Sequence, residues 1–530
     1  MLKYQQQAQF SFLVLTSIFL LVMVPEYWNH SPDSGIYVGT AEELLNSGKY
    51  WFNNFPNLQY FPGYSLILTL PISIFGTNFY ILQIFSALLA ILALWLTREY
   101  FSPKQYGLIG ILVPLIIACS SLYQTQVFRL LSDGVFLTLS IAILLLWRQW
   151  IKGQSPRVLY ACFALVAFAP LLRFQGLFIF IAIMLSMLIY EHANKSLNTK
   201  SLLRLIVIGI IVLSPFIAWS IRNYVVHTPD TFNMANKFFF GLEGLALYST
   251  EYGIISGLDS WKYPFYNVLK ALSDFNKSFF GESIIQQIGA IFTSIITAIL
   301  ILIGSKSWYK SANSLERIYV IISLFYFFGT LVTKDHLHVV PRYWVPLLPF
   351  VLVAIGFGFK YIYLTFFQSN KVRFAISSIF AAILIGILMH GIYSVNNLIG
   401  FEKPISLKHN TEVLNALASY SDENIPINTN VATTDWGVVP RAVQRTSYPT
   451  LEDSSHFESL SRIAKYNVEY LILYDQASSI FPAAARNMIK MYPDAFNSIY
   501  SIETKKPISS AEVFKIDINK IKLILNENKQ

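Results

Sequence analysis

The chain has 530 residues, of which 54% are apolar, 16% aromatic and 13% charged, and its net charge is +9. An average soluble domain has roughly 25% charged residues, so this composition excludes a soluble globular protein. It predicts a mainly α-helical, polytopic membrane protein, and we attribute the positive charge to membrane topology rather than to nucleic-acid binding. The two cysteines, Cys119 and Cys162, lie in apolar windows, which excludes a disulfide framework and a cysteine metal site.

Apolar windows long enough to cross a hydrocarbon core of roughly 30 Å as helices recur before residue 400. No small-residue cleavage site follows the first window, so we expect that window to be retained as a span. We predict about eleven spans, at residues 10–25, 78–97, 107–120, 129–147, 158–171, 174–190, 204–221, 285–304, 317–333, 343–363 and 374–396.

Short basic connections alternate with longer connections that are less basic. The basic connections hold Arg98 and Lys104; Arg148, Lys152 and Arg157; Lys195, Lys200 and Arg204; Lys306, Lys310 and Arg317; and Lys360, Lys371 and Arg373. The positive-inside rule predicts that these connections are cytoplasmic. Because the number of spans is odd, we expect a multi-pass protein of the cytoplasmic membrane with a cytoplasmic N-terminus and an extracytoplasmic C-terminal segment.

Two domains are predicted. Residues 1–397 would form the transmembrane domain, with a first outer loop at 26–77 and a long outer loop at 222–284. Residues 398–530 have the composition of a small soluble α/β domain. In that domain, strand-like runs at 431–435, 468–474 and 511–518 alternate with helical patterns at 411–421, 456–466 and 483–492.

The first outer loop is predicted to hold a short helix. Thr40 and Glu43 have the spacing of a capping box, and Gly48 is placed to end the helix. The helix has an apolar side, so we expect it to lie in the plane of the membrane interface.

Asp33 follows the first span and is the first candidate catalytic residue. Partial burial beside a helix would raise its pKa above about 3.9 and make it a better general base. The alternative is a turn residue, since Ser-Pro-Asp-Ser-Gly is also a good turn sequence.

Asp133 lies at the outer start of a predicted span, four residues after Arg129. Ionisable groups at membrane depth cost roughly 2.5 to 3.5 kcal/mol each, so a retained one is a functional candidate. The alternative is a local ion pair of Arg129 and Asp133 on one helix face.

Further cations lie at the outer ends of spans, namely Arg173, Arg222, Lys334 and Arg342. Arg binds phosphate through paired donors and Lys binds it as a point charge, so these four residues and Arg129 are candidates for holding a lipid-linked phosphate. Each one alone is equally explained as a side chain that reaches the interface. His336 and His338 form an H-x-H pair that is a candidate metal site, with interfacial polar residues as the alternative.

The order of these motifs resembles the GT-C class of membrane glycosyltransferases, in the branch of the protein O-mannosyltransferases and the aminoarabinose transferases (glycosyltransferase family 39). PDSGIYVGTAEELLNSGKY followed by FPGYSLIL resembles the first-loop signature, and LSDGVFLTL is similar to the second acidic motif. LLRFQGL, RNYVV and PRYWVPLLPF resemble the later arginine motifs. The resemblance spans residues 32–350 and suits a GT-C-like fold.

The resemblance implies transfer of a sugar from a polyprenyl-phosphate donor to a lipid, glycan or protein acceptor outside the cytoplasmic membrane. It maps the catalytic base onto Asp33, the acidic residue of the fourth span onto Asp133, and donor-phosphate binding onto Arg173 and Arg342, with Arg222 as a weaker match. No cofactor is required, and a divalent metal is left open. The alternatives are a polysaccharide polymerase or ligase that uses diphosphate-linked donors, or a transporter of lipid-linked sugars.

One departure from the resembling group lies in the first loop. Phe61, Pro62, Gly63 and Tyr64 stand where the aminoarabinose transferases have Glu-Lys-Pro-Pro. The missing Glu and Lys argue against aminoarabinose transfer and against the metal contacts of that subgroup.

Overall fold

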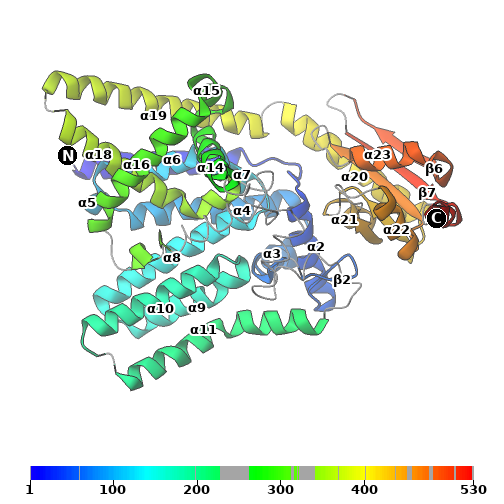
Figure 1. Cartoon of the computed structure of the whole chain (residues 1–530), viewed down its shortest axis with the longest axis horizontal. Helices are drawn as coiled ribbons and strands as arrows, with labels where there is room; N and C mark the ends of the chain where they lie inside the picture. The colour runs from blue at the N-terminus through cyan, green and yellow to red at the C-terminus, as the bar shows by residue number, and fades with distance from the viewer. Residues whose placement is uncertain are drawn as a thin grey trace. The chain divides into compact units, whose positions relative to one another are not determined.

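The computed structural model (Figure 1) describes residues 2–527 apart from residues 59, 197, 227–261, 312–314, 319, 322–340, 368, 400–401, 436, 450–455, 477–481 and 506–508. The chain forms two compact units. The first consists of Met1–Val24, Leu58–Tyr64 and Ile84–Asn397, and the second of Pro25–Asn57, Ser65–Gln83 and Leu398–Gln530. The first outer loop therefore belongs to the same unit as the C-terminal segment. The predicted boundary at residue 397 stays a prediction, because compactness is not a test of independent folding.

The described residues of the first unit form helices joined by loops, with no strand among them. In chain order it holds α1 (Leu2–Val22), α4 (Phe79–Tyr100, whose first turn belongs to the second unit), α5 (Pro103–Tyr106), α6 (Leu108–Ala118), α7 (Ser121–Phe128), α8 (Ser132–Gly153), α9 (Pro156–Leu172), α10 (Gly176–Ala193), α11 (Thr199–Val226), α14 (Lys262–Phe280), α15 (Glu282–Ile288), α16 (Ala290–Ser311), the 3-10 helix η2 (Pro341–Leu347), α18 (Leu348–Phe366) and α19 (Asn370–Ile399).

Seven described helices are long and apolar enough to cross a membrane, and an eighth candidate is the bent pair of α6 and α7, which meet at 57°. This makes the chain a multi-pass membrane protein. The predicted number of about eleven is higher for two reasons. Two predicted spans correspond to the shorter apolar helices α1 and α9, and the predicted span at 317–333 lies mostly outside the described residues.

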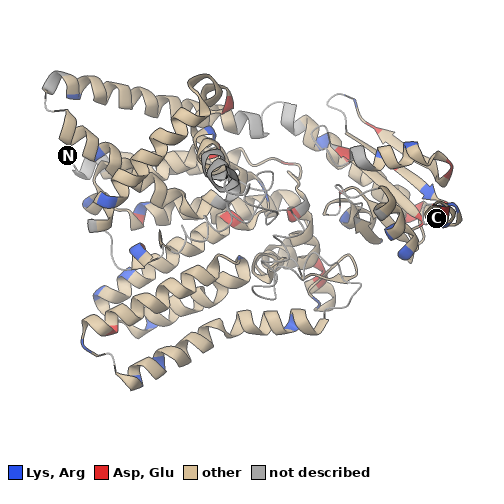
Figure 2. Cartoon of the chain, in the orientation of Figure 1, with Lys and Arg blue, Asp and Glu red and all other residues tan. Residues whose placement is uncertain are grey.

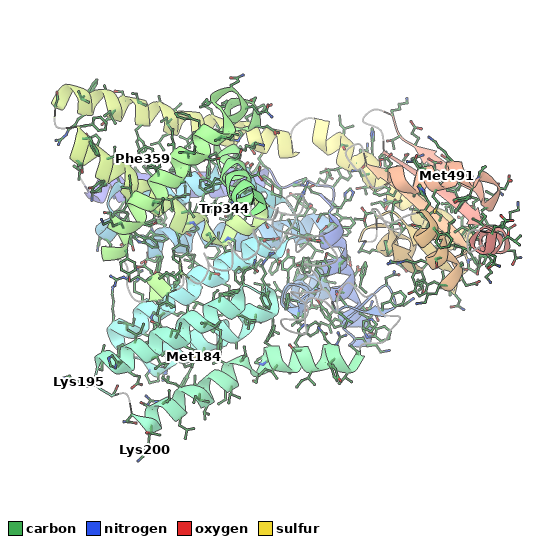
Figure 3. The ribbon with its side chains drawn as sticks, viewed as in Figure 1. Met184, Lys195, Lys200, Trp344, Phe359 and Met491 are labelled. Atoms are coloured by element: carbon green, nitrogen blue, oxygen red, sulfur yellow. The ribbon has the colours of Figure 1, made fainter. Side chains whose placement is uncertain are left out.

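The basic connections meet at one end of the helical unit. Arg148, near the end of α8, donates hydrogen bonds to the carbonyls of Tyr100 at 2.6 Å and Glu99 at 3.0 Å, at the end of α4. At the turn between α10 and α11, Arg204 forms an ion pair with Glu191. Figure 2 shows Lys and Arg gathered at this end, and Figure 3 shows Lys195 and Lys200 at the turn of α10 into α11. The predicted grouping of these connections agrees with the structure.

Part of the predicted long outer loop is helical. α14 and α15 occupy its last third, and residues 227–261 lie outside the described residues. α14 packs against η2, where the indole Nε1 of Trp344 donates a hydrogen bond to the carbonyl of Ala271 at 3.0 Å (Figure 3). This contact joins the end of the long loop to the segment that carries Arg342.

The second unit contains a mixed five-stranded sheet in the order β4-β3-β5-β7-β6. β4, β3 and β5 are parallel, whereas β5, β7 and β6 are antiparallel. The C-terminal elements are α20 (Glu402–Asn424), β3 (Asn430–Thr433), α21 (Val439–Val443), β4 (Thr446–Pro449), α22 (His456–Lys465), β5 (Tyr470–Gln476), α23 (Pro482–Met491), η3 (Pro493–Ala495), β6 (Phe496–Glu503), β7 (Ser509–Ile516) and α24 (Ile518–Glu527). The predicted α/β character is confirmed.

The first-loop elements of this unit are α2 (Pro32–Ser47), β1 (Trp51–Phe52) and β2 (Phe55–Pro56), followed by α3 (Pro62–Phe75), which begins in the first unit. α2 ends as predicted, at a left-handed Gly48 with φ 72°. Its predicted start was wrong: Ser31 is the N-cap, and Pro32 opens the helix. The reason is that Ser followed by Pro at the first helical position is a strong start signal, which leaves Thr40 buried inside the helix.

Asp435 lies in the turn after β3 and is almost fully buried. Its carboxylate accepts hydrogen bonds from the backbone N–H of Gly437 at 3.1 Å and of Val438 at 2.9 Å. Burial raises the pKa of Asp435 to about 6, against the opposing effect of these two hydrogen bonds. The carboxyl group therefore holds the turn between β3 and α21 in shape.

The raised pKa has a consequence for stability. The folded chain binds the Asp435 proton more tightly than the unfolded chain, so the contribution of this group is complete below about pH 4 and is lost as the pH rises through about 6. A shift of about two pKa units corresponds to roughly 3 kcal/mol. We expect Asp435→Asn, whose amide oxygen still accepts both N–H groups, to flatten the pH dependence of thermal unfolding between about pH 4 and about pH 7. Equal slopes for variant and wild type would contradict this assignment.

Candidate active site

Asp33 lies in the first turn of α2, in the second unit. The N-cap Ser31 and Ser34 form a reciprocal capping box: Ser34 Oγ accepts from the N–H of Ser31 at 2.8 Å, and Ser31 Oγ accepts from the N–H of Ser34 at 3.3 Å. A carboxylate in the first turn is favoured by the unpaired N–H groups and dipole of a helix start. Asp33 is half-buried. The structure therefore has Asp33 on a capped helix rather than in the isolated turn considered as the alternative.

Asp133 lies in the first unit, at the start of α8, and only 1% of its side chain is exposed. Its Oδ1 is 2.6 Å from Nη1 of Arg173, the residue that ends α9. The alternative pairing of Asp133 with Arg129 is wrong. Arg129 has an extended backbone (φ −128°, ψ 153°) after α7, and α8 begins only at Ser132, so the two residues do not share a helix face.

The Arg173 guanidinium is held by further contacts, and its side chain is 11% exposed. Nη1 donates to Ser132 Oγ at 3.2 Å, and Nε donates to Gln175 Oε1 at 3.0 Å. The sequence reasoning missed Ser132 and Gln175, although both are polar residues beside the predicted charged ones. Such contacts fix the plane of the guanidinium, which suits recognition of a phosphate by paired donors.

The first-loop motif requires glycine at position 63, because the backbone there lies against another backbone segment. A Cβ atom at position 63 would lie 2.7 Å from the carbonyl oxygen of Leu171 and 2.8 Å from Cα of Leu172, at the end of α9. Only glycine permits this close approach of two backbones. The next residue, Tyr64, is fully buried, and its hydroxyl lies 3.0 Å from Ser86 Oγ. The motif thus packs directly against the segment that presents Arg173.

The other predicted phosphate ligands are less closely defined. Arg222, near the end of α11, donates to Asn223 Oδ1 at 2.8 Å and lies over the ring of Trp219 at 4.9 Å. α11 packs against α9, so Arg222 and Arg173 come from the same ends of neighbouring parallel helices. Arg342 is in η2, which packs against α7 and α8. Nε of Arg129 is buried without a hydrogen-bond partner among the described residues.

Lys334, His336 and His338 lie outside the described residues. Within the described part of the chain, no group of three or more His, Cys, Asp or Glu side chains is placed to hold a metal ion. The roles of these three residues stay predictions.

The site residues are divided between the two units: Asp33 lies in the second, and Asp133, Arg173, Arg222 and Arg342 lie in the first. Their convergence in one cavity stays a prediction. Within the first unit, Asp133 and Arg173 lie at the end opposite the basic connections. α8 has 22 residues, or roughly 33 Å of helix, with Asp133 in its first turn and Lys152 in its last.

Residues 60–219 match the model of the dolichyl-phosphate-mannose-protein mannosyltransferase family. This match includes Gly63, Asp133 and Arg173. In three dimensions the chain is similar to ArnT from Cupriavidus metallidurans in the apo state, with a TM-score of 0.50 and 13% identity over 96% of this chain and 98% of that chain. The matched region is 160 of the 530 residues, and the likeness to ArnT is one of fold. The predicted GT-C-like fold, with its C-terminal mixed sheet, is confirmed.

Two further solved structures are similar to this chain. ArnT from Cupriavidus metallidurans bound to undecaprenyl phosphate has a TM-score of 0.48 and 12% identity, over 95% of this chain and 97% of that chain. The oligosaccharyltransferase of Archaeoglobus fulgidus in the apo form has a TM-score of 0.49 and 12% identity, over 93% of this chain and 73% of that chain. A comparison with curated proteins finds no matching sequence.

Removing one charge of the buried ion pair should destabilise the folded protein. In Asp133→Asn, Arg173 keeps its charge in a buried position without a counter-charge, and we expect a loss of roughly 3 kcal/mol. Adding Arg173→Gln to the same chain should restore much of the loss, because neither charge then remains. Thermal unfolding of the purified protein in detergent compares the stability of the wild type with that of the two variants.

Lys408→Gln is the matched control, since it removes an ion pair with Glu412 whose two side chains are 54% and 51% exposed. An exposed pair is worth about 0 to 1 kcal/mol. If Asp133→Asn and Lys408→Gln shift unfolding equally, the buried pair does not have the importance assigned to it.

Proposed function

We propose that this protein is a membrane glycosyltransferase that moves a monosaccharide from a polyprenyl-phosphate donor to an acceptor on the outer face of the cytoplasmic membrane. The observation that carries the proposal is the buried ion pair of Asp133 with the fixed guanidinium of Arg173. It lies in the region that matches a family described by a dolichyl-phosphate-mannose donor. A fixed guanidinium at the end of a membrane helix suits a phosphate that stays in the headgroup region with its lipid.

The proposed orientation is supported by the distribution of charge. The end of the helical unit with Arg148 and Arg204 carries the basic connections, which the positive-inside rule assigns to the cytoplasm. Asp133 and Arg173 are then extracytoplasmic. The protein is thus a multi-pass protein of the cytoplasmic membrane, with its N-terminus inside and its C-terminal segment outside.

In the proposed mechanism, the carboxylate of Asp33 is the general base. It takes the proton of an acceptor hydroxyl as the hydroxyl oxygen attacks the anomeric carbon. The bond from that carbon to the phosphate oxygen breaks, and its electron pair leaves with the polyprenyl phosphate. Attack from the face opposite the phosphate inverts the anomeric centre.

The leaving phosphate needs positive charge, which Arg173 would supply together with Arg342 and Arg222. Lys334 and Arg129 are further candidates for this role. The reaction requires no cofactor, because a phosphate paired with guanidinium groups is a sufficient leaving group. A divalent metal held by His336 and His338 is an alternative source of the same charge. The acceptor is a lipid, glycan or protein that carries a hydroxyl group.

Asp33→Asn tests the proposed base. Full-length protein in membranes is supplied with labelled polyprenyl-phosphate mannose, and the label in lipid, glycan and protein fractions is measured. We expect transfer to fall by about 100- to 10,000-fold, the usual contribution of a general base. Glu43→Gln, another neutralised carboxylate on α2, is the matched control and should keep wild-type transfer. Wild-type transfer by Asp33→Asn would remove Asp33 from the reaction.

The chemistry of the donor separates the proposal from its rivals. We expect transfer from a monosaccharide linked through one phosphate and no transfer from an oligosaccharide linked through a diphosphate. Transfer from the diphosphate donor alone would favour a polymerase or ligase. Movement of the intact labelled donor across vesicle membranes, with no product formed, would favour a transporter.

A further inference from the structure

Arg441, in the C-terminal segment, links parts of the second unit that are far apart in the sequence. It lies on α21 and donates a hydrogen bond from Nη2 to Oε1 of Glu42, in the middle of α2, at 2.8 Å. Thr77 also donates to the same carboxylate oxygen. Both side chains of the ion pair are largely buried, with 21% of Arg441 and 26% of Glu42 exposed.

The Arg441 guanidinium also contacts two aromatic rings. Its central carbon lies 4.6 Å from the ring centre of Phe79 and 5.8 Å from that of Trp28, and these two rings stack at 4.1 Å. A guanidinium over aromatic faces gains cation–π attraction as well as packing. A single residue of α21 thus contacts α2, the start of the first outer loop at Trp28 and the start of α4 at Phe79.

A second contact holds the start of α2. The carbonyl oxygen of Gly437 would lie 2.0 Å from a Cβ atom at Gly35, so the two backbones touch at a position two residues after Asp33. Gly437 belongs to the turn that the carboxylate of Asp435 caps. On the other side of Asp33, Nε2 of His30 lies 3.2 Å from the hydroxyl of Tyr474 on β5.

A third contact holds the segment after α2. Asn53 and Asn54 have φ values of 55° and 66°, as a two-residue turn between β1 and β2 requires. Asn53 donates to the carbonyl of Ser447 at 2.8 Å and accepts from its N–H at 3.2 Å, while Asn54 donates to Thr446 Oγ1 at 2.9 Å. The asparagine amide thereby covers the open edge of β4.

We propose that Arg441 is a positioning residue for the reaction, and that the C-terminal segment sets the location of the Asp33 carboxylate by holding α2 before, along and after its length. The proposal rests on the proposed function, because it acts through Asp33 as the base. A general base must lie within hydrogen-bond reach of the proton it takes, and a misplacement of about 1 Å can cost about 100-fold in rate. Removal of the Arg441 contact should therefore lower kcat and leave the KM for the donor nearly unchanged.

Steady-state transfer from polyprenyl-phosphate mannose by the full chain tests this. We expect Arg441→Gln to lower kcat by about 10- to 100-fold with less than about a twofold change in donor KM. Arg441→Lys, which keeps a charge for Glu42, should recover much of the loss. In the double variant with Arg441→Glu and Glu42→Arg, the two charges are exchanged. Its kcat should be higher than that of either single variant.

Arg486→Gln is the matched control. Arg486 makes the same kind of ion pair in the same unit, with Nη1 2.6 Å from Glu512 Oε1, but its partners are on β5 and β7 and not on α2. Equal kcat for Arg441→Gln and Arg486→Gln, with Asp33→Asn inactive, would overturn the positioning role and leave the proposed function standing. Wild-type turnover by Asp33→Asn would overturn both. If Arg441→Gln fails to fold, Arg441→Lys and the double variant are measured in its place. The positioning role would be overturned if both of them have a kcat no higher than that of Arg441→Glu or Glu42→Arg alone.

Discussion

Hydrocarbon cannot satisfy a backbone N–H or carbonyl group, and this constraint determines where the polar chemistry of the protein lies. Long apolar helices cross the membrane, so charged side chains collect at helix ends. Asp133 lies in the first turn of α8, Arg173 follows α9, and Arg222 is close to the end of α11. A charge at such a helix end is partly dehydrated and therefore needs a partner of opposite charge. Asp133 and Arg173 are each other's partners. A lipid-linked phosphate brought to the same depth would meet a guanidinium that is already oriented.

The two units divide the proposed reaction between them. The helical unit holds the arginines that suit the donor phosphate, while the second unit holds α2 with Asp33. In that second unit the first outer loop is bound to a mixed sheet formed more than 350 residues later in the chain. The C-terminal segment is thus part of the structure that carries the proposed base. Such an arrangement lets contacts outside the membrane influence chemistry at the membrane surface.

Much of the fold could be predicted from the sequence because it depends on local signals. Apolar windows long enough to span the membrane, the glycine that ends α2 and the strand patterns of β3, β5 and β7 are properties of adjacent residues. Apart from the start of α2, the errors arose where distant residues decide. Arg129 pairs well with Asp133 on an ideal helix, but the helix breaks between them, and Arg173 from the next helix takes its place. Gly35 and Gly437 are both ordinary in sequence, and only the fold brings their backbones together. β6 escaped prediction because most of its side chains are exposed.

The proposed mechanism requires the Asp33 carboxylate and the Arg173 guanidinium to act on the same polyprenyl-phosphate donor. The most direct test is an experimental structure of the full chain with polyprenyl phosphate bound in a lipid bilayer. We predict a phosphate oxygen within about 3.5 Å of the Arg173 guanidinium, with Asp33 facing it across a space that fits one sugar ring. An Asp33 carboxylate that points away from the phosphate, or that lies across the roughly 30 Å of hydrocarbon from it, would contradict the account.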